Sequence, residues 1–174
     1  MQLSLRHVKA GTEDYEFVAD LYDFSFPKEE QEKIENIMKV SETSLGEFSV
    51  VLDGDVRVGL LHLMMRKDLV YIYYLAIDPG MRKRGYGSAV LDLVRTIYPG
   101  HRFALNSEAP DDTAKNNEQR LERIEFYEKN GFVDSGTRTT WEGVTYALMT
   151  SGGNVRKHET WKLFRMAEKV AKKS

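Results

Sequence analysis

The stretch between residues 70 and 91 places the strongest constraint on how this chain can fold. It begins with an apolar run of aromatic and β-branched residues, stops at Asp78-Pro79-Gly80, and continues through a basic, glycine-rich turn into an amphipathic segment. This pattern predicts a strand, a loop and a helix in that order. Because the helix would begin beside Gly85 and Gly87, its free backbone N–H groups would be open to an anionic group.

The size and charge of the chain limit the classes of protein it can belong to. With 174 residues, of which 41% are hydrophobic and 30% charged, it has the composition of one soluble domain. A net charge of -2 gives no indication of a nucleic-acid-binding protein. No run of 18 apolar residues and no signal pattern occurs, so we expect a cytoplasmic protein without a membrane partner. The absence of cysteine excludes disulfides, thiolate metal sites and a thiol nucleophile, and we expect no metal.

Hydrophobic periodicity predicts the elements that come before the loop. They are a strand near residues 3–8, a helix capped by Thr12, a second helix that begins with Pro27, and strands over 47–52 and 56–65. The turn at 53–55 joins the last two strands into a hairpin, so three adjacent antiparallel strands should precede the loop. The acidic residues after Pro27 either favour the positive end of that second helix or face a cationic ligand.

After the loop, the chain predicts a strand over residues 102–108 that lies parallel to the strand before the loop. A helix then ends at Asn130-Gly131, and a last pair of strands lies within 138–149. Residues 155–174 are basic and amphipathic, which indicates a terminal helix that either docks with a solvated basic face or contacts a partner or an anionic surface. We therefore expect one main domain over 1–150, with residues 151–174 packed on it or extending it.

Two common phosphate-binding patterns do not fit the glycine loop. A dinucleotide fingerprint needs a third glycine where Val90 stands, and the strands before the loop form hairpins instead of a βαβ unit. A P-loop needs Gly-Lys-Ser/Thr, which does not follow. What remains is Arg-x-x-Gly-x-Gly over residues 82–87, placed between a strand and a helix.

In this respect the sequence resembles the Gcn5-related N-acetyltransferase (GNAT) superfamily, whose acetyl-CoA pyrophosphate loop has the pattern Gln/Arg-x-x-Gly-x-Gly/Ala. Residues 126–132, Phe-Tyr-Glu-Lys-Asn-Gly-Phe, look like the second conserved block of that family. The order of the elements over about residues 1–150 is also similar. The resemblance implies an α/β fold with a twisted, mixed and mostly antiparallel sheet, a splayed parallel strand pair and flanking helices.

The resemblance also implies which residues bind acetyl-CoA, the expected co-substrate. Glycines without a Cβ and three basic side chains suit a pyrophosphate, and a bulge in the preceding strand would free backbone groups for the acetyl carbonyl and the pantetheine arm. The expected residues are Leu75, Ile77, Arg82, Lys83, Arg84, Gly85, Tyr86, Gly87 and Ser88.

Without cysteine, direct attack of an amine on acetyl-CoA is the natural route. The resemblance places the acid that protonates the leaving thiolate at Tyr127. For the base we predict Glu108, at the end of the second parallel strand, with Glu30, Glu47 and a tyrosine-bound water as competitors. Glu30 is also expected to bind the acceptor, together with Tyr73 and Tyr74.

The chain departs from the family at two positions, where Arg120 and Arg123 replace the Asn and Ala that many relatives carry before the tyrosine. These arginines either reach phosphates or a substrate carboxylate, or lie on the surface. We expect an N-acetyltransferase for a primary amine of a small molecule or peptide, and a homodimer is compatible with these features. The competing hypothesis is a catalytically silent acyl-CoA-binding or regulatory module, and a nucleotide-binding oxidoreductase ranks third.

Overall fold

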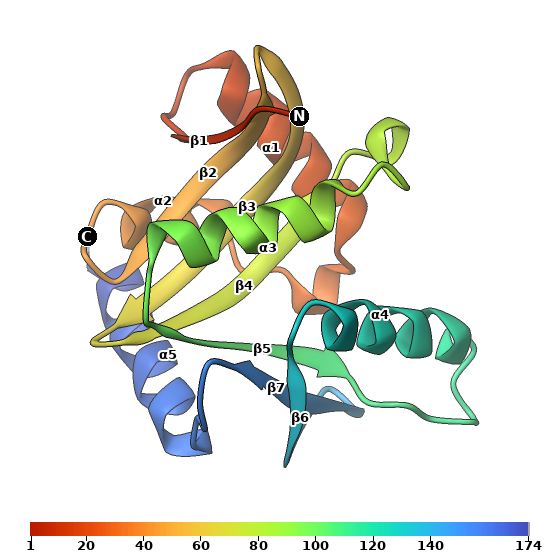
Figure 1. Cartoon of the computed structure of the whole chain (residues 1–174). Coiled ribbons are helices and arrows are strands. Elements are labelled where there is room, and N and C mark those ends of the chain that lie inside the picture. The colour runs from red at the N-terminus through yellow and green to blue at the C-terminus, as the bar shows by residue number, and fades with distance from the viewer. Residues whose placement is uncertain (174) are drawn as a thin grey trace.

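The computed structural model describes residues 1–173, which form a seven-stranded sheet with helices on both faces (Figure 1). The strands follow the order β1-β2-β3-β4-β5-β7-β6 across the sheet. They are β1 (Leu3–His7), β2 (Gly46–Asp53), β3 (Val56–Arg66), β4 (Leu69–Ile77), β5 (Arg102–Glu108), β6 (Val133–Trp141) and β7 (Val144–Ser151). The helices are α1 (Glu13–Ser25), α2 (Ile34–Ser41), α3 (Tyr86–Ile97), α4 (Asn117–Lys129) and α5 (Lys157–Ala171), with the 3-10 turns η1 (Lys28–Glu30) and η2 (Pro79–Met81). Ser174, the end of the predicted terminal segment, lies outside the described residues.

A single parallel pair divides the sheet. Strands β4 and β5 are paired over only three positions, from Leu69 with Arg102 to Tyr71 with Ala104, whereas every other neighbouring pair in residues 1–173 is antiparallel. Beyond Tyr71, β4 continues along β3 while β5 follows β7 as far as Glu108. The two strands therefore diverge, as Figure 1 shows, and we call the V-shaped gap between their backbones the opening. The predicted mixed sheet with a splayed parallel pair is confirmed.

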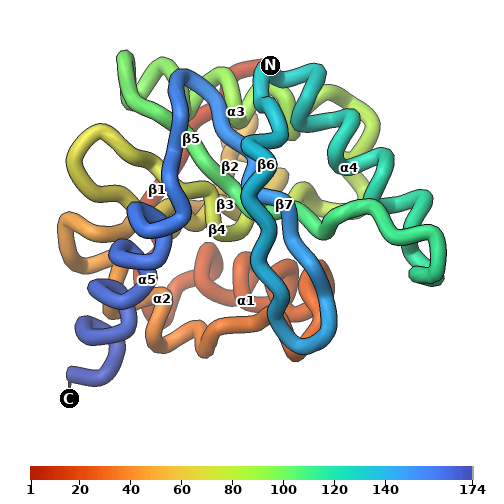
Figure 2. Tube along the Cα trace, turned by 90° about the horizontal axis from the view of Figure 1, so that it is seen from below, coloured from red at the N-terminus to blue at the C-terminus, as the bar shows by residue number. Residues whose placement is uncertain are grey.

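The sheet carries a hydrophobic core on each face, and Figure 2 shows the two layers of helices on opposite sides of it. Helices α3 and α4 cover one face, where Val90 and Val94 pack on strand residues such as Leu63. Helices α1, α2 and α5 cover the other face, with Val18 and Leu163 among their fully buried side chains. No described helix combines the length and the apolar character that crossing a bilayer requires.

The second helix begins seven residues later than Pro27, so this prediction was wrong. Pro27 precedes the short turn η1, the chain then runs extended, and α2 starts at Ile34. The reason is a long-range contact: the Tyr74 hydroxyl donates to the Glu30 carbonyl (2.6 Å) and accepts from the Glu32 N–H (3.0 Å). Backbone groups bound in this way are not available to a helix. The acidic residues after Pro27 therefore lie in a loop rather than in the first turn of α2.

The C-terminal helix α5 packs on α2 and β3. Its Phe164 ring lies edge-on to Tyr71, with centroids 4.9 Å apart, and close to Tyr73 at 5.9 Å. At the start of α5, Glu159 accepts hydrogen bonds from Arg102 of β5. The helix thus brings an aromatic side chain from the end of the chain to the middle of β4.

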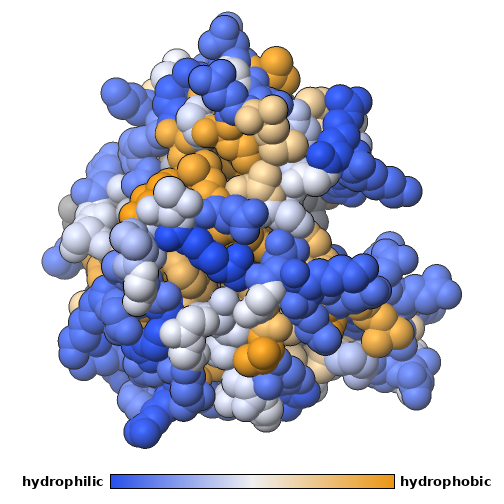
Figure 3. Space-filling model, viewed as in Figure 1, coloured by the Kyte–Doolittle hydropathy of each residue, from blue (hydrophilic) through white to orange (hydrophobic). Residues whose placement is uncertain are grey.

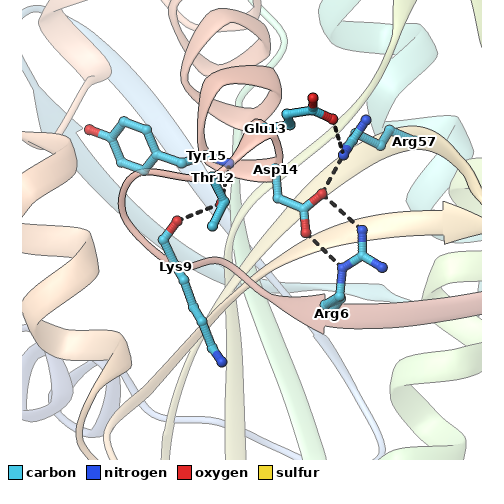
Figure 4. A network of polar contacts seen from close by, with 7 residues as sticks. All are labelled: Arg6, Lys9, Thr12, Glu13, Asp14, Tyr15 and Arg57. Carbon is cyan, nitrogen blue, oxygen red and sulfur yellow. Dashed lines mark hydrogen bonds and ion pairs between the residues drawn. The ribbon is translucent and has the colours of Figure 1, made fainter.

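The first helix is fixed to the sheet by a carboxylate that two arginines share (Figure 4). Asp14, in the first turn of α1, accepts hydrogen bonds from Arg6 of β1 (2.7 and 2.9 Å) and from Arg57 of β3 (2.8 Å). The Asp14 side chain is 10% exposed. The hydrogen bond from Arg6, together with that from Arg57, lowers the pKa of Asp14 from 3.8 to about 2.

Asp14→Asn should lower the free energy of unfolding by about 2 kcal/mol at neutral pH, because a pKa unit corresponds to about 1.4 kcal/mol. The folded-state pKa is depressed, so this stability is present above 3.8 and is lost as the pH falls toward about 2. Urea unfolding at pH 7 and pH 3 measures both effects. Asp20→Asn, at an exposed position of the same helix, is the control and should change stability by less than about 0.5 kcal/mol. An equal loss in both variants would contradict the role of the arginines.

Candidate functional site

The strand β4 contains one extra residue next to the opening. His62 of β3 pairs with Tyr74 and the next residue, Leu63, pairs with Ile72, so Tyr73 is left without a partner in the β3–β4 ladder. This is a β-bulge. The side chains of Tyr73 and Tyr74 both contact aromatic rings on the face covered by α1, α2 and α5. The predicted bulge lies in the predicted strand, two residues before Leu75, which faces the opening.

The backbone of β4 beyond the bulge is directed into the opening. The Asp78 N–H donates to the Val58 carbonyl of β3 (2.8 Å), and successive residues of a strand point their backbone groups to opposite sides. Leu75 and Ile77 therefore face away from β3, toward the gap that β5 leaves. The Ile77 carbonyl accepts a hydrogen bond from the Arg82 side chain (3.2 Å). Leu75 and Ile77 thus hold the positions predicted for contacts with an extended ligand.

The glycine loop lies at the end of this backbone edge. Gly85 caps α3 with φ at 84°, a left-handed conformation that favours glycine. Within residues 1–173 the backbone N–H groups of residues 82–88 donate no hydrogen bond, and the first helical bond joins the Ala89 N–H to the Gly85 carbonyl. The side chains of residues 82–84 are exposed. Free donors at a helix start beside three cationic residues suit a pyrophosphate.

Gly87 and Tyr86 have different roles in this loop. A Cβ at Gly87 would lie 3.0 Å from the Phe126 ring of α4, so the small residue allows the two helices to approach. The Tyr86 side chain points into the core, where its hydroxyl donates to the Asp53 carboxylate (2.6 Å). Tyr86 can therefore reach a ligand only through its backbone. Ser88 is half-buried in the first turn of α3. Figure 3 shows a notch in the surface between this loop and α4.

Tyr127 projects from α4 toward the core of the same sheet face. Its ring packs against Phe126, at 5.1 Å between centroids, and Phe132, at 5.7 Å. Burial raises the pKa of Tyr127, and the nearby Arg123 opposes this only in part. The hydroxyl has no hydrogen-bond partner among residues 1–173. A neutral phenol with a free hydroxyl can donate a proton.

Glu108 lies at the end of β5 with its carboxylate occupied by basic groups. Its Oε2 is 2.9 Å from Arg120, and its Oε1 is 3.6 Å from Arg123. Arg120 is buried and also donates to the Ala109 carbonyl (3.1 Å) and to Asn116 (2.8 Å). Arg120 thus connects α4 to the end of β5. The sequence had suggested either a ligand-binding or a surface position for this residue, and it has neither in the structure. Arg123 is half-exposed.

The two other carboxylates considered for the base, those of Glu30 and Glu47, contact different parts of the sheet. Glu30 in η1 accepts a hydrogen bond from the hydroxyl of Tyr146 in β7 (2.7 Å) and has no cationic partner in the described chain. Its backbone carbonyl is held by Tyr74. Glu47, in contrast, contacts His7 of β1 and Ser49 of β2, on the part of the sheet away from β5. Of the competitors for the base, only Glu30 shares a hydrogen bond with the β5–β7 part of the sheet.

Comparison with known proteins agrees with this geometry. The sequence model of the acetyltransferase (GNAT) domain matches residues 44–134, which is more than half of the chain. The protein belongs to the GNAT acetyltransferase family. This GNAT domain includes the bulge, the glycine loop and Tyr127, whereas α1, α5, Glu30 and Tyr146 lie outside the match. No curated protein sequence matches the chain.

Several solved structures share the fold of this GNAT protein. A GNAT-family protein from Bacteroides thetaiotaomicron has a TM-score of 0.74 and 21% identity, over 96% of this chain and 95% of that one. A spermidine N-acetyltransferase chimera from Vibrio cholerae and hSSAT has a TM-score of 0.63 and 20% identity, over 87% and 95%. A GNAT acetyltransferase from Elizabethkingia anophelis with acetyl-CoA bound has a TM-score of 0.57 and 15% identity, over 86% and 97%. The likeness covers nearly the whole length of each protein.

Proposed function

We propose that this GNAT protein transfers an acetyl group from acetyl-CoA to a primary amine of a small molecule or peptide. The observation that carries the proposal is a row of backbone groups along one side of the opening that no neighbouring strand pairs with, in which the Ile77 carbonyl has only the exposed Arg82 side chain as a partner. It runs from Leu75 and Ile77 of β4 to the N–H groups of residues 82–88. The amides of a pantetheine arm complement the first part, and a pyrophosphate complements the second. The GNAT acetyltransferase from Elizabethkingia anophelis, which shares this fold, has acetyl-CoA bound, and this supports acetyl-CoA as the donor.

The reaction needs two proton transfers. The amine nitrogen bonds to the acetyl carbon, the carbon–sulfur bond breaks, and the thiolate leaves with the electron pair. An alkylamine has a pKa of about 10.4, so freeing its lone pair at pH 7 costs about 4 to 5 kcal/mol. A thiol has a pKa of about 8.5 and a phenol about 10, so proton transfer from an ordinary phenol to the thiolate is uphill by about 2 kcal/mol, and the raised pKa of Tyr127 increases this cost. Tyr127 is the proposed acid.

Glu108 and Glu30 are the two candidates for the group that takes the proton from the amine. Glu108 stays a prediction for this role because it lies beside the opening. Two guanidinium groups, however, approach both of its oxygens and compete with an incoming amine. Glu30 has no such competitor among residues 1–173. We therefore propose that Glu30 contacts the amine and takes the proton that the amine loses before it attacks, and that Glu108 positions α4 through Arg120.

The experiment that tests the proposal combines binding and turnover. Calorimetric titration with acetyl-CoA measures binding, and thiol release with a panel of diamines, aminoglycosides, amino acids and peptides measures transfer. We expect saturable binding and amine-dependent release of thiol. Tight binding without turnover across the panel would favour the catalytically silent module. Binding of NAD instead of acetyl-CoA would favour the oxidoreductase.

Gly85→Ala should weaken acetyl-CoA binding by about 5- to 30-fold. A residue with a Cβ is about 1 to 2 kcal/mol less stable in the left-handed conformation. The loop relieves this strain by changing its backbone conformation, which moves its N–H groups away from the pyrophosphate. Gly100→Ala is the matched control, because Gly100 has φ at 75°, has open space around it, and follows the other end of α3. The control should retain the affinity of the wild type. An equal loss of affinity in both variants would assign the effect to general destabilisation.

A further inference from the structure

One hydrogen bond connects β7 with the segment between α1 and α2, which is far from it in the sequence. The Tyr146 hydroxyl of β7 donates to the Glu30 carboxylate of η1 at 2.7 Å, across 116 residues of chain. Figure 2 shows the β6–β7 hairpin reaching toward the segment between α1 and α2. Neither residue lies in the part of the chain that the family model matches.

Two carboxylates flank Tyr146, and their surroundings differ. Glu108 is its cross-strand partner and is bound by Arg120 and Arg123. Glu30 has only the neutral phenol as a partner, within residues 1–173. Burial and the carboxylate of Glu30 raise the pKa of Tyr146, so the phenol stays a donor at neutral pH. A neutral donor fixes a carboxylate without cancelling its charge, whereas an arginine would cancel it.

The backbone around Glu30 is fixed independently of Tyr146. The Tyr74 hydroxyl holds the Glu30 carbonyl and the Glu32 N–H, and the Tyr22 hydroxyl donates to the Glu32 carbonyl (2.7 Å). These contacts orient the loop but leave the Glu30 side chain free to rotate. Its direction therefore depends on Tyr146.

We infer that Tyr146 is a positioning residue that aims the Glu30 carboxylate at the positively charged amine of the acceptor. The inference rests on the proposed function and deepens it: the acceptor is a cationic primary amine that pairs with Glu30, on the sheet face where Tyr73 is 36% exposed. When the amine binds, its ammonium group occupies the Glu30 oxygens that no cation of the described chain holds. Tyr146 itself does not take part in the transfer.

The test compares Tyr146→Phe, Glu30→Gln and the double variant. With 1,4-diaminobutane as the probe and protein saturated with CoA, we expect about a tenfold weaker amine affinity in each variant, since hydrogen bonds to charged groups are among the stronger ones. With the best acceptor of the amine panel, the KM for the amine should rise about tenfold in Tyr146→Phe while the KM for acetyl-CoA does not change. The double variant should bind the amine no more weakly than Glu30→Gln, because both changes remove one coupled interaction.

Tyr98→Phe is the control, since it removes a half-buried phenol hydroxyl that contacts the Met65 sulfur and no residue of the Glu30 loop. It should keep the amine affinity of the wild type. The inference is overturned if Tyr146→Phe behaves like Tyr98→Phe, if the two losses add in the double variant, or if the wild type does not bind the diamine. If amine binding depends on Tyr146 but no acetyl group is transferred, the proposed function is contradicted and the inference about Tyr146 is not.

Discussion

Tyr127→Phe should lower kcat by about 100- to 10,000-fold, the range that general acid catalysis contributes, and leave the KM for acetyl-CoA close to that of the wild type. The thiolate would then have to leave unprotonated or take its proton from water. The ring would still pack against Phe126 and Phe132, so the fold should not change. Steady-state thiol release with the best acceptor of the amine panel measures both constants.

The control is Tyr98→Phe, at the other end of α3, where the hydroxyl lies 3.6 Å from the Met65 sulfur. This variant removes a phenol from the same core but not from the site, and it should keep the wild-type kcat. If Tyr127→Phe also keeps the wild-type kcat while binding acetyl-CoA normally, Tyr127 only packs in the core and another group supplies the proton.

Arg120→Leu should lower the free energy of unfolding by about 3 kcal/mol, because removal of one partner of a buried ion pair leaves the other charge uncompensated. The side chains of Arg120 and Glu108 are 9% and 12% exposed. The substitution also removes donors from the Ala109 carbonyl and from Asn116. Urea unfolding at neutral pH measures the effect.

Arg123→Leu is the matched control on the same helix. Arg123 is 48% exposed and lies 3.6 Å from Glu108, so its removal should cost less than about 1 kcal/mol. Combining Arg120→Leu with Glu108→Leu should restore part of the lost stability, since no charge is then buried alone. If Arg120→Leu and Arg123→Leu cost the same, the burial of Arg120 does not determine its contribution.

Much of the fold follows from local patterns that the sequence displays. Thr12 caps α1 by accepting a hydrogen bond from the Tyr15 N–H, and the turn after Asp53 joins β2 and β3. The glycine loop was recognisable because Arg-x-x-Gly-x-Gly stands between a strand pattern and a helix pattern, and the structure explains Gly85 by its left-handed conformation. These features depend on neighbours in the sequence, and periodicity and turn chemistry are sufficient to predict them.

The features that sequence reasoning missed all depend on distant partners. Pro27 looked like a helix start, but the Tyr74 hydroxyl binds the backbone after it and delays α2. Arg120 looked like a surface or phosphate-binding residue, and its burial depends on the end of β5. Tyr146 carries no local signal at all, because its partner Glu30 lies 116 residues away. Only the register of β5 with β7 brings Tyr146 to the site.

The short pairing of β4 with β5 has a consequence for how this protein avoids unwanted association. Unpaired strand edges normally lie at the periphery of a sheet, where they can pair with another chain and begin aggregation. Here β4 beyond Tyr71 and the facing side of β5 are also unpaired edges, but they lie inside the molecule, between two halves of one sheet. The two halves of the sheet and the helices on both faces therefore surround these edges and separate them from the strands of other chains.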